Sequence, residues 1–296
     1  MSARQNIFKG RLFLLVLVLP FLVSCRSIRF YTESTTKIHP EKHIDYFPDD
    51  LNESSGLEKI GDKMLSFNDS GGEAELFFFP PLSPMQISKV KIPGISNIDW
   101  EDIAKDSNYL YIGDFGNNNG TRDTLIIYRI AIEGIMTNNI SAETISFSYV
   151  EMDSTHLNKA RNSFDCEAMT MIDDSLWIFT KNWKDESSWV YKLPAIPGHY
   201  ELKLKAVLEP AMLVTGADYS INCNILYLLG YHGFRPRIRA YYFDGNSFHD
   251  YFLVRFDNRF GVHTEGIFAG EEGVYFSNEK SLRKPGLFYM KIEQRQ

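Results

Sequence analysis

The sequence predicts an all-β fold, a β-propeller of five four-stranded blades. A short acidic phrase recurs along the chain, and runs of strand-forming residues follow each copy. The strong copies span residues 99–103, 165–169 and 263–267, and weaker copies span residues 53–57 and 215–219. Four short strands in roughly 45–50 residues are typical of one propeller blade. Aromatic residues make up 14% of the chain, which also favours strands over helices.

The spacing of the phrase sets the number of blades. Aligned on Ser55, Glu101, Glu167, Ala217 and Glu265, its copies lie 46, 66, 50 and 48 residues apart. The longest interval contains two stretches that are typical of loops, residues 117–123 and 152–163. A degenerate sixth blade in this interval is the alternative to five blades.

The ring of blades is predicted to close through an N-terminal strand. The last copy of the repeat ends at Ile292, which leaves no room for a fourth strand. A propeller must cover its last open edge, and residues 28–46 can supply the missing strand. We therefore divide the mature chain into a tether with the closing strand, residues 25–50, and the propeller, residues 51–296.

The N-terminus predicts export and lipid anchoring. Arg4, Lys9 and Arg11 precede an apolar run over residues 12–23, which is too short to span a bilayer as a helix. The run ends in Leu22-Val23-Ser24-Cys25, which resembles the lipobox of bacterial lipoproteins. The resemblance implies a signal peptide over residues 1–24 and acylation, for example with palmitate, at Cys25. The protein is then expected on a membrane of the bacterial cell envelope, inner or outer.

Charge and cysteine content restrict the partners. The net charge is -7, so no basic surplus is available to neutralise the phosphates of a nucleic acid. Besides Cys25 the chain contains Cys166 and Cys223, and nothing in the sequence brings them together in a disulfide. No cysteine or histidine cluster has the spacing of a zinc site.

The repeat predicts where carboxylates converge. The first strand of each propeller blade lines the central channel, so Glu101, Glu167 and Glu265 should face one another across it. Residues two positions earlier share the same face of each strand, and the ends of the second strands reach a comparable level. The first set contains Glu53, Asp99, Asp165 and His263. The second set contains Asn68, Asp69, Asp114, Lys181, Asn182, His232, Asn278, Glu279 and Lys280.

Several carboxylates in one channel need compensation for their charge, and three solutions stay open. The first is Ca²⁺ or another divalent cation, since Asp, Glu and Asn oxygens suit a hard cation. Its candidate ligands are Asp99, Glu101, Asp114, Asp165, Glu167, Glu265 and Asn278. The second is acid–base catalysis by Glu101, Glu167, Glu265 or His263. The third is a structural network neutralised by Lys181, Lys280 and backbone N–H groups.

The repeated segments resemble those of uncharacterised bacterial propeller lipoproteins. The resemblance is carried by residues 53–57 with 68–72, residues 99–104 with 113–118, and residues 165–169. More distantly the chain is similar to the SdiA-regulated family and to gluconolactonase-like and NHL-type propellers. Gluconolactonase-like proteins hold a divalent cation with Glu, Asn and Asp, but their ligand set does not map position by position onto this chain.

The sequence thus favours a lipid-anchored envelope propeller with a binding or scaffold role. Its acidic channel is expected to bind a divalent cation or a small polar ligand, and an envelope protein is a further candidate partner. The alternative is a cation-dependent hydrolase acting on a lactone, phosphoester or glycan through the channel carboxylates. No other cofactor is expected, because no nucleotide-binding, zincin or haem motif is present.

Overall fold

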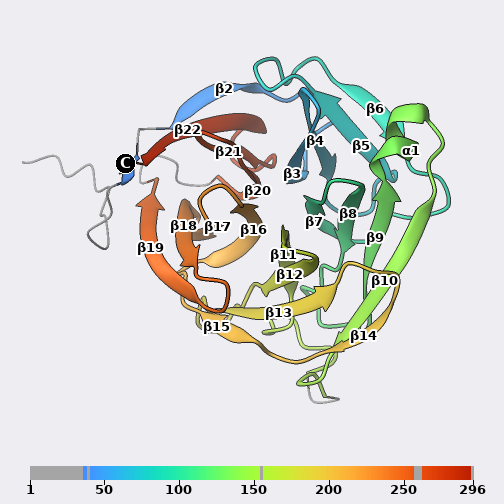
Figure 1. Ribbon diagram of the computed structural model, residues 1–296, viewed down its shortest axis with the longest axis vertical. Helices are drawn as coiled ribbons and strands as arrows, with labels where there is room; N and C mark the ends of the chain where they lie inside the picture. The colour runs from blue at the N-terminus through green and yellow to red at the C-terminus, as the bar shows by residue number, and fades with distance from the viewer. Residues whose placement is uncertain (1–35, 39–40, 154–155, 257–261, 295–296) are drawn as a thin grey trace, which may run out of the picture.

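Five antiparallel sheets surround one central axis in the computed structural model of the protein (Figure 1). The structure describes residues 36–38, 41–153, 156–256 and 262–294. The predicted five-bladed propeller is confirmed, and the described residues form no sixth sheet. The predicted signal peptide and Cys25 lie outside the described residues.

Each blade begins at the axis and runs outward, because strands that follow one another in sequence pair in order. Blade 1 contains β3 (Ser54–Ile60), β4 (Lys63–Asn68), β5 (Glu75–Phe79) and β6 (Ser88–Lys91). Blade 2 contains β7 (Trp100–Lys105), β8 (Tyr109–Asp114), β9 (Leu125–Ala131) and β10 (Ala142–Tyr149). Blade 3 contains β11 (Cys166–Ile172), β12 (Ser175–Thr180), β13 (Ser188–Pro194) and β15 (Ala206–Leu208). Blade 4 contains β16 (Leu213–Ser220), β17 (Ile225–His232), β18 (Arg235–Phe243) and β19 (Phe248–Arg255). Blade 5 contains β20 (Thr264–Ala269), β21 (Gly273–Asn278) and β22 (Gly286–Gln294).

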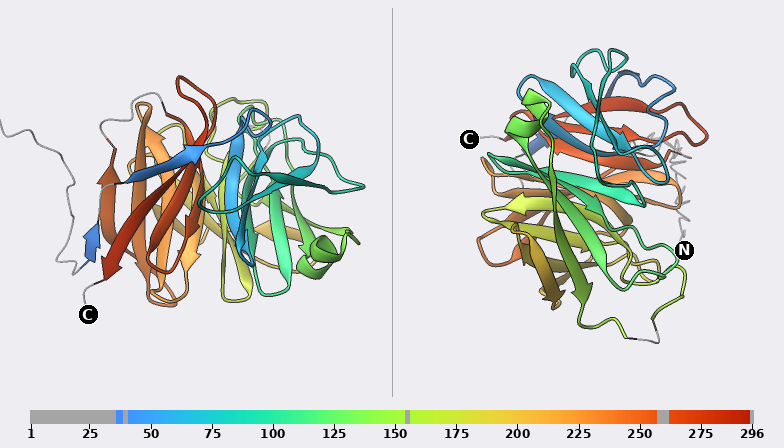
Figure 2. Two further views of the ribbon diagram at one scale, coloured as in Figure 1. Left: turned by 90° about the horizontal axis from the view of Figure 1, so that it is seen from above. Right: turned by 90° about the vertical axis from the view of Figure 1, so that its right-hand side faces the viewer.

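Blade 5 is completed by the N-terminal part of the chain, as predicted. β2 (Lys42–Tyr46) pairs antiparallel with the first half of β22, and β1 (Thr36–Ile38) pairs with its end. Figure 1 shows β2 in blue lying along β22 in red, and the side views of Figure 2 show the same contact. The two ends of the chain therefore share one sheet, which covers the last open edge of the ring.

Two features of blades 2 and 3 differ from a plain four-stranded repeat. A short helix, α1 (Ile132–Thr137), connects β9 to β10. β14 (Gly198–Leu202) crosses over from the chain of blade 3 and pairs parallel with β10. This added strand covers the outer edge of blade 2, and its Leu202 side chain is buried in the core between blades 2 and 3.

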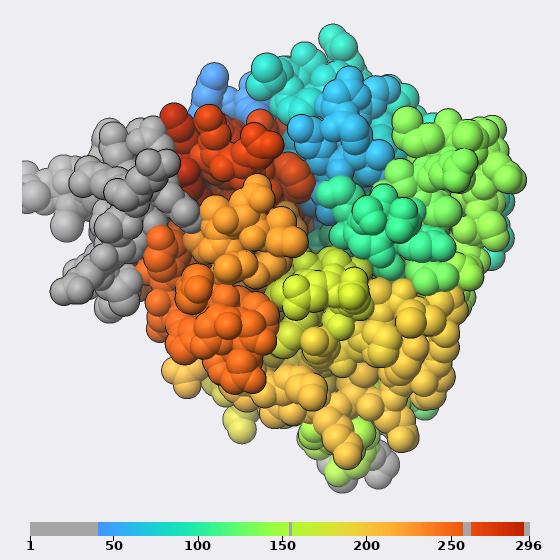
Figure 3. Space-filling view, viewed as in Figure 1, coloured from blue at the N-terminus to red at the C-terminus, as the bar shows by residue number. Residues whose placement is uncertain are grey.

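The hydrophobic core consists of five clusters, one between each pair of neighbouring blades. The cluster between blades 2 and 3, for example, packs Phe147 and Tyr191 with Ile178. Large side chains are needed here because the faces of two twisted sheets separate toward the rim. The space-filling view shows the sectors following one another round the same centre (Figure 3).

Cys166 and Cys223 are both free thiols. Cys166 is buried between blades 2 and 3, while Cys223 lies partly exposed in the turn between β16 and β17. Among the residues described, none of the helices has the length and apolar character that crossing a bilayer requires.

Candidate functional site

A β-bulge in the first strand of every blade turns one side chain toward the axis. The register of each inner strand shifts at or beside Ser55, Glu101, Glu167, Thr215 and Glu265. Such bulges re-aim a side chain at the rims of barrels and near functional sites. The predicted convergence of the three glutamates is therefore supported by the backbone.

The fourth copy of the phrase is corrected by its strand pairing. Val214 pairs with Gly230 and Gly216 pairs with Leu229, so Thr215 is the bulged residue of β16. The sequence alignment on Ala217 was two residues too late. Ala217 instead follows the bulge, and its backbone N–H faces the axis, where it donates to Asp102.

Asp102 closes the channel below the ring of bulged residues. The side chain has no exposed surface, and its carboxyl accepts hydrogen bonds from the backbone N–H groups of Ile103, Met169 and Ala217 at 2.8, 2.8 and 3.0 Å. These donors lie on blades 2, 3 and 4. The equivalent positions of the other blades are Gly56, Ala168, Gly216 and Gly266. An added Cβ atom at Gly216 would lie 2.4 Å from the carbonyl oxygen of Glu265, and one at Gly266 would lie 2.8 Å from that of Gly56, so the close approach of the blades excludes side chains there. The Asp102 carboxyl lies between the two mouths of the channel.

Three carboxylates meet at the mouth that the acidic phrase predicts. Asp69 at the end of β4 joins Asp99 and Glu101, and one oxygen from each lies within 4.8 Å of the others. Glu101 is only 4% exposed. Among the described residues no hydrogen-bond donor or ion-pair partner contacts any of these three carboxylates, and one oxygen of Asp69 is buried without a partner. We call these three residues the acidic triad.

The absence of a side chain at Gly116 leaves space for the carboxylates of the triad. Gly116 follows β8, and a Cβ atom there would lie 2.2 Å from Oε1 of Glu101 and 2.3 Å from Oδ2 of Asp99. A larger residue at position 116 would displace both carboxylates. Asp69 was recognised in the sequence only as part of a strand end, because its proximity to Glu101 depends on how blades 1 and 2 pack.

Burial raises the pKa of all three groups of the triad. It raises the pKa of Asp69 to about 8 and that of Asp99 to about 6, and it raises the pKa of Glu101 well above its ordinary value. Neighbouring negative charges contribute to each shift, Asp99 acting on Asp69 and Glu167 acting on Glu101. A buried carboxylate without donors favours either a proton or a bound cation.

The other side of the same mouth has its own counter-ion. Lys181, at the end of β12, lies 3.0 Å from Oε1 of Glu167 and is 6% exposed. Burial alone would lower the pKa of Lys181, but the charges of Glu167 and Glu265 help raise it well above its ordinary value. Glu167 holds this ammonium in place, and its positive charge partly offsets the rise in pKa of Asp69, Asp99 and Glu101 as well.

His263 and Glu265 form a second group with Glu279. Nδ1 of His263 lies 2.9 Å from Oε1 of Glu279, and the imidazole stacks on the ring of Tyr231 with their centroids 5.2 Å apart. His263 therefore has a hydrogen-bond partner and an aromatic neighbour. This group differs from the acidic triad because His263 is hydrogen-bonded to one of its carboxylates, whereas no hydrogen-bond donor among the described residues contacts the triad.

The remaining predicted ligands make structural contacts, but two of them keep a buried oxygen without a hydrogen-bond partner. Asp114 forms an ion pair with Arg122 through Oδ1 at 3.0 Å, whereas its Oδ2 has no partner among the described residues. Asp165 accepts hydrogen bonds from the backbone N–H of Asn117 and from Nε1 of Trp183. Asn278 donates from Nδ2 to two backbone carbonyl groups beside the β21–β22 turn, and its Oδ1 has no partner among the described residues. These contacts involve loop residues, which an alignment of the repeated strands does not include.

The chain matches no protein-family model, and no curated protein matches it. Solved structures with a similar fold include a hypothetical protein from Leishmania major, 13% identical with a TM-score of 0.49, covering 86% of this chain and 90% of that one. A protein from Lactobacillus plantarum is 14% identical with a TM-score of 0.44, covering 80% and 67%. A candidate glycoside hydrolase from Parabacteroides distasonis is 8% identical with a TM-score of 0.47, covering 85% and 88%. Likenesses of this size carry no conclusion about activity.

Proposed function

We propose that the acidic triad of Asp69, Asp99 and Glu101 binds a divalent cation, with Ca²⁺ the first choice. One observation carries the proposal: the buried carboxylate of Glu101 and the half-buried carboxylates of Asp69 and Asp99 approach within 4.8 Å, and within the described residues no hydrogen-bond donor contacts them. Oxygen ligands of this kind suit Ca²⁺. A bound cation would replace the protons that the raised pKa values otherwise require.

The cation would also define what the protein binds. A metal held by three carboxylates at a channel mouth presents its free positions to solvent, where oxygen atoms of a small polar ligand can coordinate. The neighbouring Lys181 and Tyr231 border the same mouth. A binding role in the cell envelope is therefore our proposal. The hydrolase alternative stays a prediction, and turnover of a lactone, phosphoester or glycan that is lost in Glu167→Gln would support it.

Calcium is expected to raise the melting temperature. A ligand at about 100 times its Kd stabilises the native state by about 2.7 kcal/mol. For a domain of this size we expect an increase in Tm of roughly 5–10 °C, reversed by EDTA. Differential scanning calorimetry of the purified propeller, with and without Ca²⁺, measures the effect. An unchanged Tm over the full range of Ca²⁺ and other divalent cations would contradict the proposal.

Two matched pairs of variants locate the cation. Glu101→Gln should abolish the Ca²⁺ effect and melt no lower than the parent without Ca²⁺, because it removes like-charge repulsion. Gly116→Ala should also abolish the effect, by displacing Glu101 and Asp99. The control for the first is Glu271→Gln, an exposed carboxylate elsewhere. The control for the second is Gly72→Ala, where an added Cβ has no neighbour within 4 Å.

The pH dependence of the Ca²⁺ effect provides an independent check. Folding raises the pKa of Asp69 and Asp99 above their unfolded values, so the cation-free protein should gain stability as the pH falls from about 8 to about 5.5. Protons then compete with Ca²⁺ for the same oxygens. The gain in Tm from Ca²⁺ should be smaller at about pH 5.5 than at about pH 8.

We also propose that the mature protein is anchored through a lipid on Cys25. The support is the sequence Leu22-Val23-Ser24-Cys25 after a short apolar run. Expressed with its full N-terminus in a bacterium, the protein should incorporate labelled palmitate and partition with membranes. Cys25→Ser should lose both properties. Label retained in Cys25→Ser would contradict the assignment of Cys25.

A further inference from the structure

The second mouth of the channel, on the other side of Asp102, opens into a cavity of about 820 Å³. Strand pairing aligns a second set of positions, three residues beyond the bulge of each inner strand, as Glu58, Ala104, Thr170, Asp218 and Phe268. All of them except Ala104 line the cavity and form its floor. The strong copies of the acidic phrase end one residue before this ring, and Asp218 belongs to a weak copy whose register the sequence alignment misplaced.

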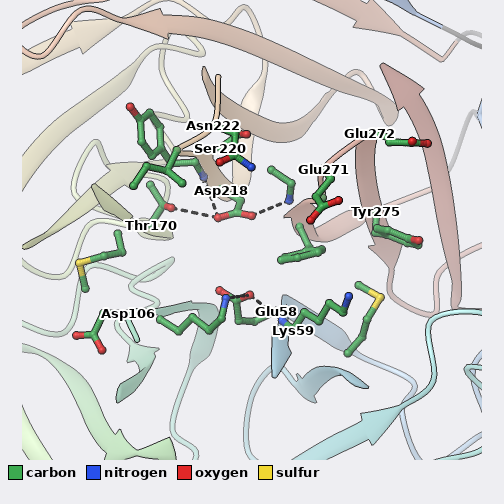
Figure 4. A pocket seen from close by; sticks show the side chains of 18 of the residues that line it. Glu58, Lys59, Asp106, Thr170, Asp218, Ser220, Asn222, Glu271, Glu272 and Tyr275 are labelled. Atoms are coloured by element: carbon green, nitrogen blue, oxygen red, sulfur yellow. Dashed lines mark hydrogen bonds and ion pairs between the residues drawn. The ribbon is translucent and has the colours of Figure 1, made fainter. Parts of the chain in front are cut away.

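Two carboxyl groups face each other across this floor. Figure 4 shows Glu58 and Asp218 pointing toward one another from blades 1 and 4, which are not neighbours in the ring. Glu58 is 4% exposed, and its Oε1 accepts from Nζ of Lys105 at 2.9 Å. Within the described residues no donor contacts its Oε2. Asp218 accepts from the hydroxyl of Thr170 and from two backbone N–H groups.

The polar groups of the floor can accept further hydrogen bonds, but their donors are already used. Lys105 is already paired with Glu58, and the Thr170 hydroxyl already donates to Asp218. One ammonium thus serves two carboxyl groups, and each carboxyl group has a raised pKa, chiefly through burial. A ligand that fits this floor must bring hydrogen-bond donors and positive charge.

The rim and walls narrow the class of ligand further. Asp106, Asp173, Glu271 and Glu272 line the cavity with the two floor carboxyls, whereas Lys59 and Lys105 are its only basic side chains within the described residues. The rings of Phe268 and Tyr275 form an apolar wall with their centroids 6.3 Å apart. Nζ of Lys105 already lies over the Phe268 ring at 5.9 Å, so this wall accommodates a cation.

We propose that this second mouth, the amine pocket of Glu58, Asp218, Phe268 and Tyr275, binds an organic cation, a primary ammonium group carried on an unbranched carbon chain. The ammonium donates to Oε2 of Glu58 and to the Asp218 carboxyl. The carbon chain lies against Phe268 and Tyr275, and a second ammonium group reaches the acidic rim at Glu271 and Glu272. This site is independent of the proposed cation site, because Asp102 lies between them.

Isothermal titration calorimetry with 1,5-diaminopentane tests the proposal on the propeller with Ca²⁺ held constant. We expect saturable binding that weakens with added salt, and no binding of the neutral matched probe 1,5-pentanediol. Glu58→Gln should weaken diamine binding at least about tenfold, about 1.4 kcal/mol. Phe268→Leu should weaken it several-fold. Glu133→Gln changes an exposed carboxylate on α1, away from both mouths, and is the control that should leave diamine binding unchanged.

Glu58→Gln removes the ion-pair partner of Lys105 and can therefore disturb folding. A variant at the rim of the pocket tests the proposal independently of that effect. Glu271→Gln combined with Glu272→Gln changes only exposed side chains, and we expect about two- to fivefold weaker diamine binding. No saturable diamine binding at low salt would overturn the proposal. If 1,5-pentanediol binds as tightly as the diamine, the proposal is overturned in favour of a polyol site. Diamine binding that is unchanged in both the floor variant and the rim variant would also overturn it.

Discussion

Asp102→Ala is expected to lower the free energy of unfolding by about 3–5 kcal/mol, a large fraction of the stability of an ordinary domain. The substitution leaves the N–H groups of Met169 and Ala217 without an acceptor at a fully buried point on the axis. An unsatisfied buried donor costs about 1–3 kcal/mol. Because these donors belong to blades 3 and 4, the loss weakens the contact of three blades at once.

Urea unfolding of Asp102→Ala beside two companion variants measures this effect. Asp62→Ala removes an exposed aspartate from the β3–β4 turn and should cost less than about 0.5 kcal/mol. Asp102→Asn retains an acceptor oxygen and should fall between the parent and the alanine variant. A cost below about 1 kcal/mol for Asp102→Ala would mean that other groups or water satisfy these N–H donors.

Removal of the closing strands is the second change with a large expected effect. A chain that begins at Phe47 lacks β1 and β2, so the outer edge of β22 loses its partners from Gly286 to Gln294. We expect Tm to fall by an amount on the order of 10 °C. The open edge should also pair between molecules and produce concentration-dependent association.

A chain that begins at Thr36 is the matched control, because it lacks the preceding residues and keeps both closing strands. It should melt like the full mature chain and elute as the same species in size-exclusion chromatography. Equal Tm values and equal elution for the two truncated chains would contradict the closing role of β1 and β2.

Blade number could be predicted from the sequence because it depends on local, repeated information. Each blade carries its own alternation of apolar and polar residues, and the acidic phrase marks where each inner strand begins. The alignment was wrong in blade 4, where Thr215, Gly216 and Ala217 are all small and fit the phrase in more than one register. Only the pairing of β16 with β17 decides between them. The parallel addition of β14 to blade 2 was not predictable, since the pairing joins segments of two blades.

In the candidate site, too, some residues could be predicted from the repeat, whereas others depend on tertiary packing. Glu101, Glu167 and Glu265 were placed together from the repeat, and their positions at the bulges support that placement. Asp114 and Asp165 have the same chemistry, but Asn117 and Trp183 bind both oxygens of Asp165, and Arg122 binds one oxygen of Asp114. Asp69 enters the acidic triad only through the packing of blade 1 on blade 2. The floor of the amine pocket lies three residues beyond the bulges, where the sequence analysis placed no site.

The sequence by itself determined the five blades and the level of the three glutamates, because both follow from a local repeat, and it determined the closing N-terminal strand from the strand missing in the last repeat. Only the tertiary structure decided which carboxylates have donors and which do not. The physical reason is that the donors come from other strands, Met169 and Ala217 of blades 3 and 4 for Asp102, and Lys181 at the end of the neighbouring strand for Glu167. A carboxylate's chemistry is set by these neighbours more than by its own position in a repeat.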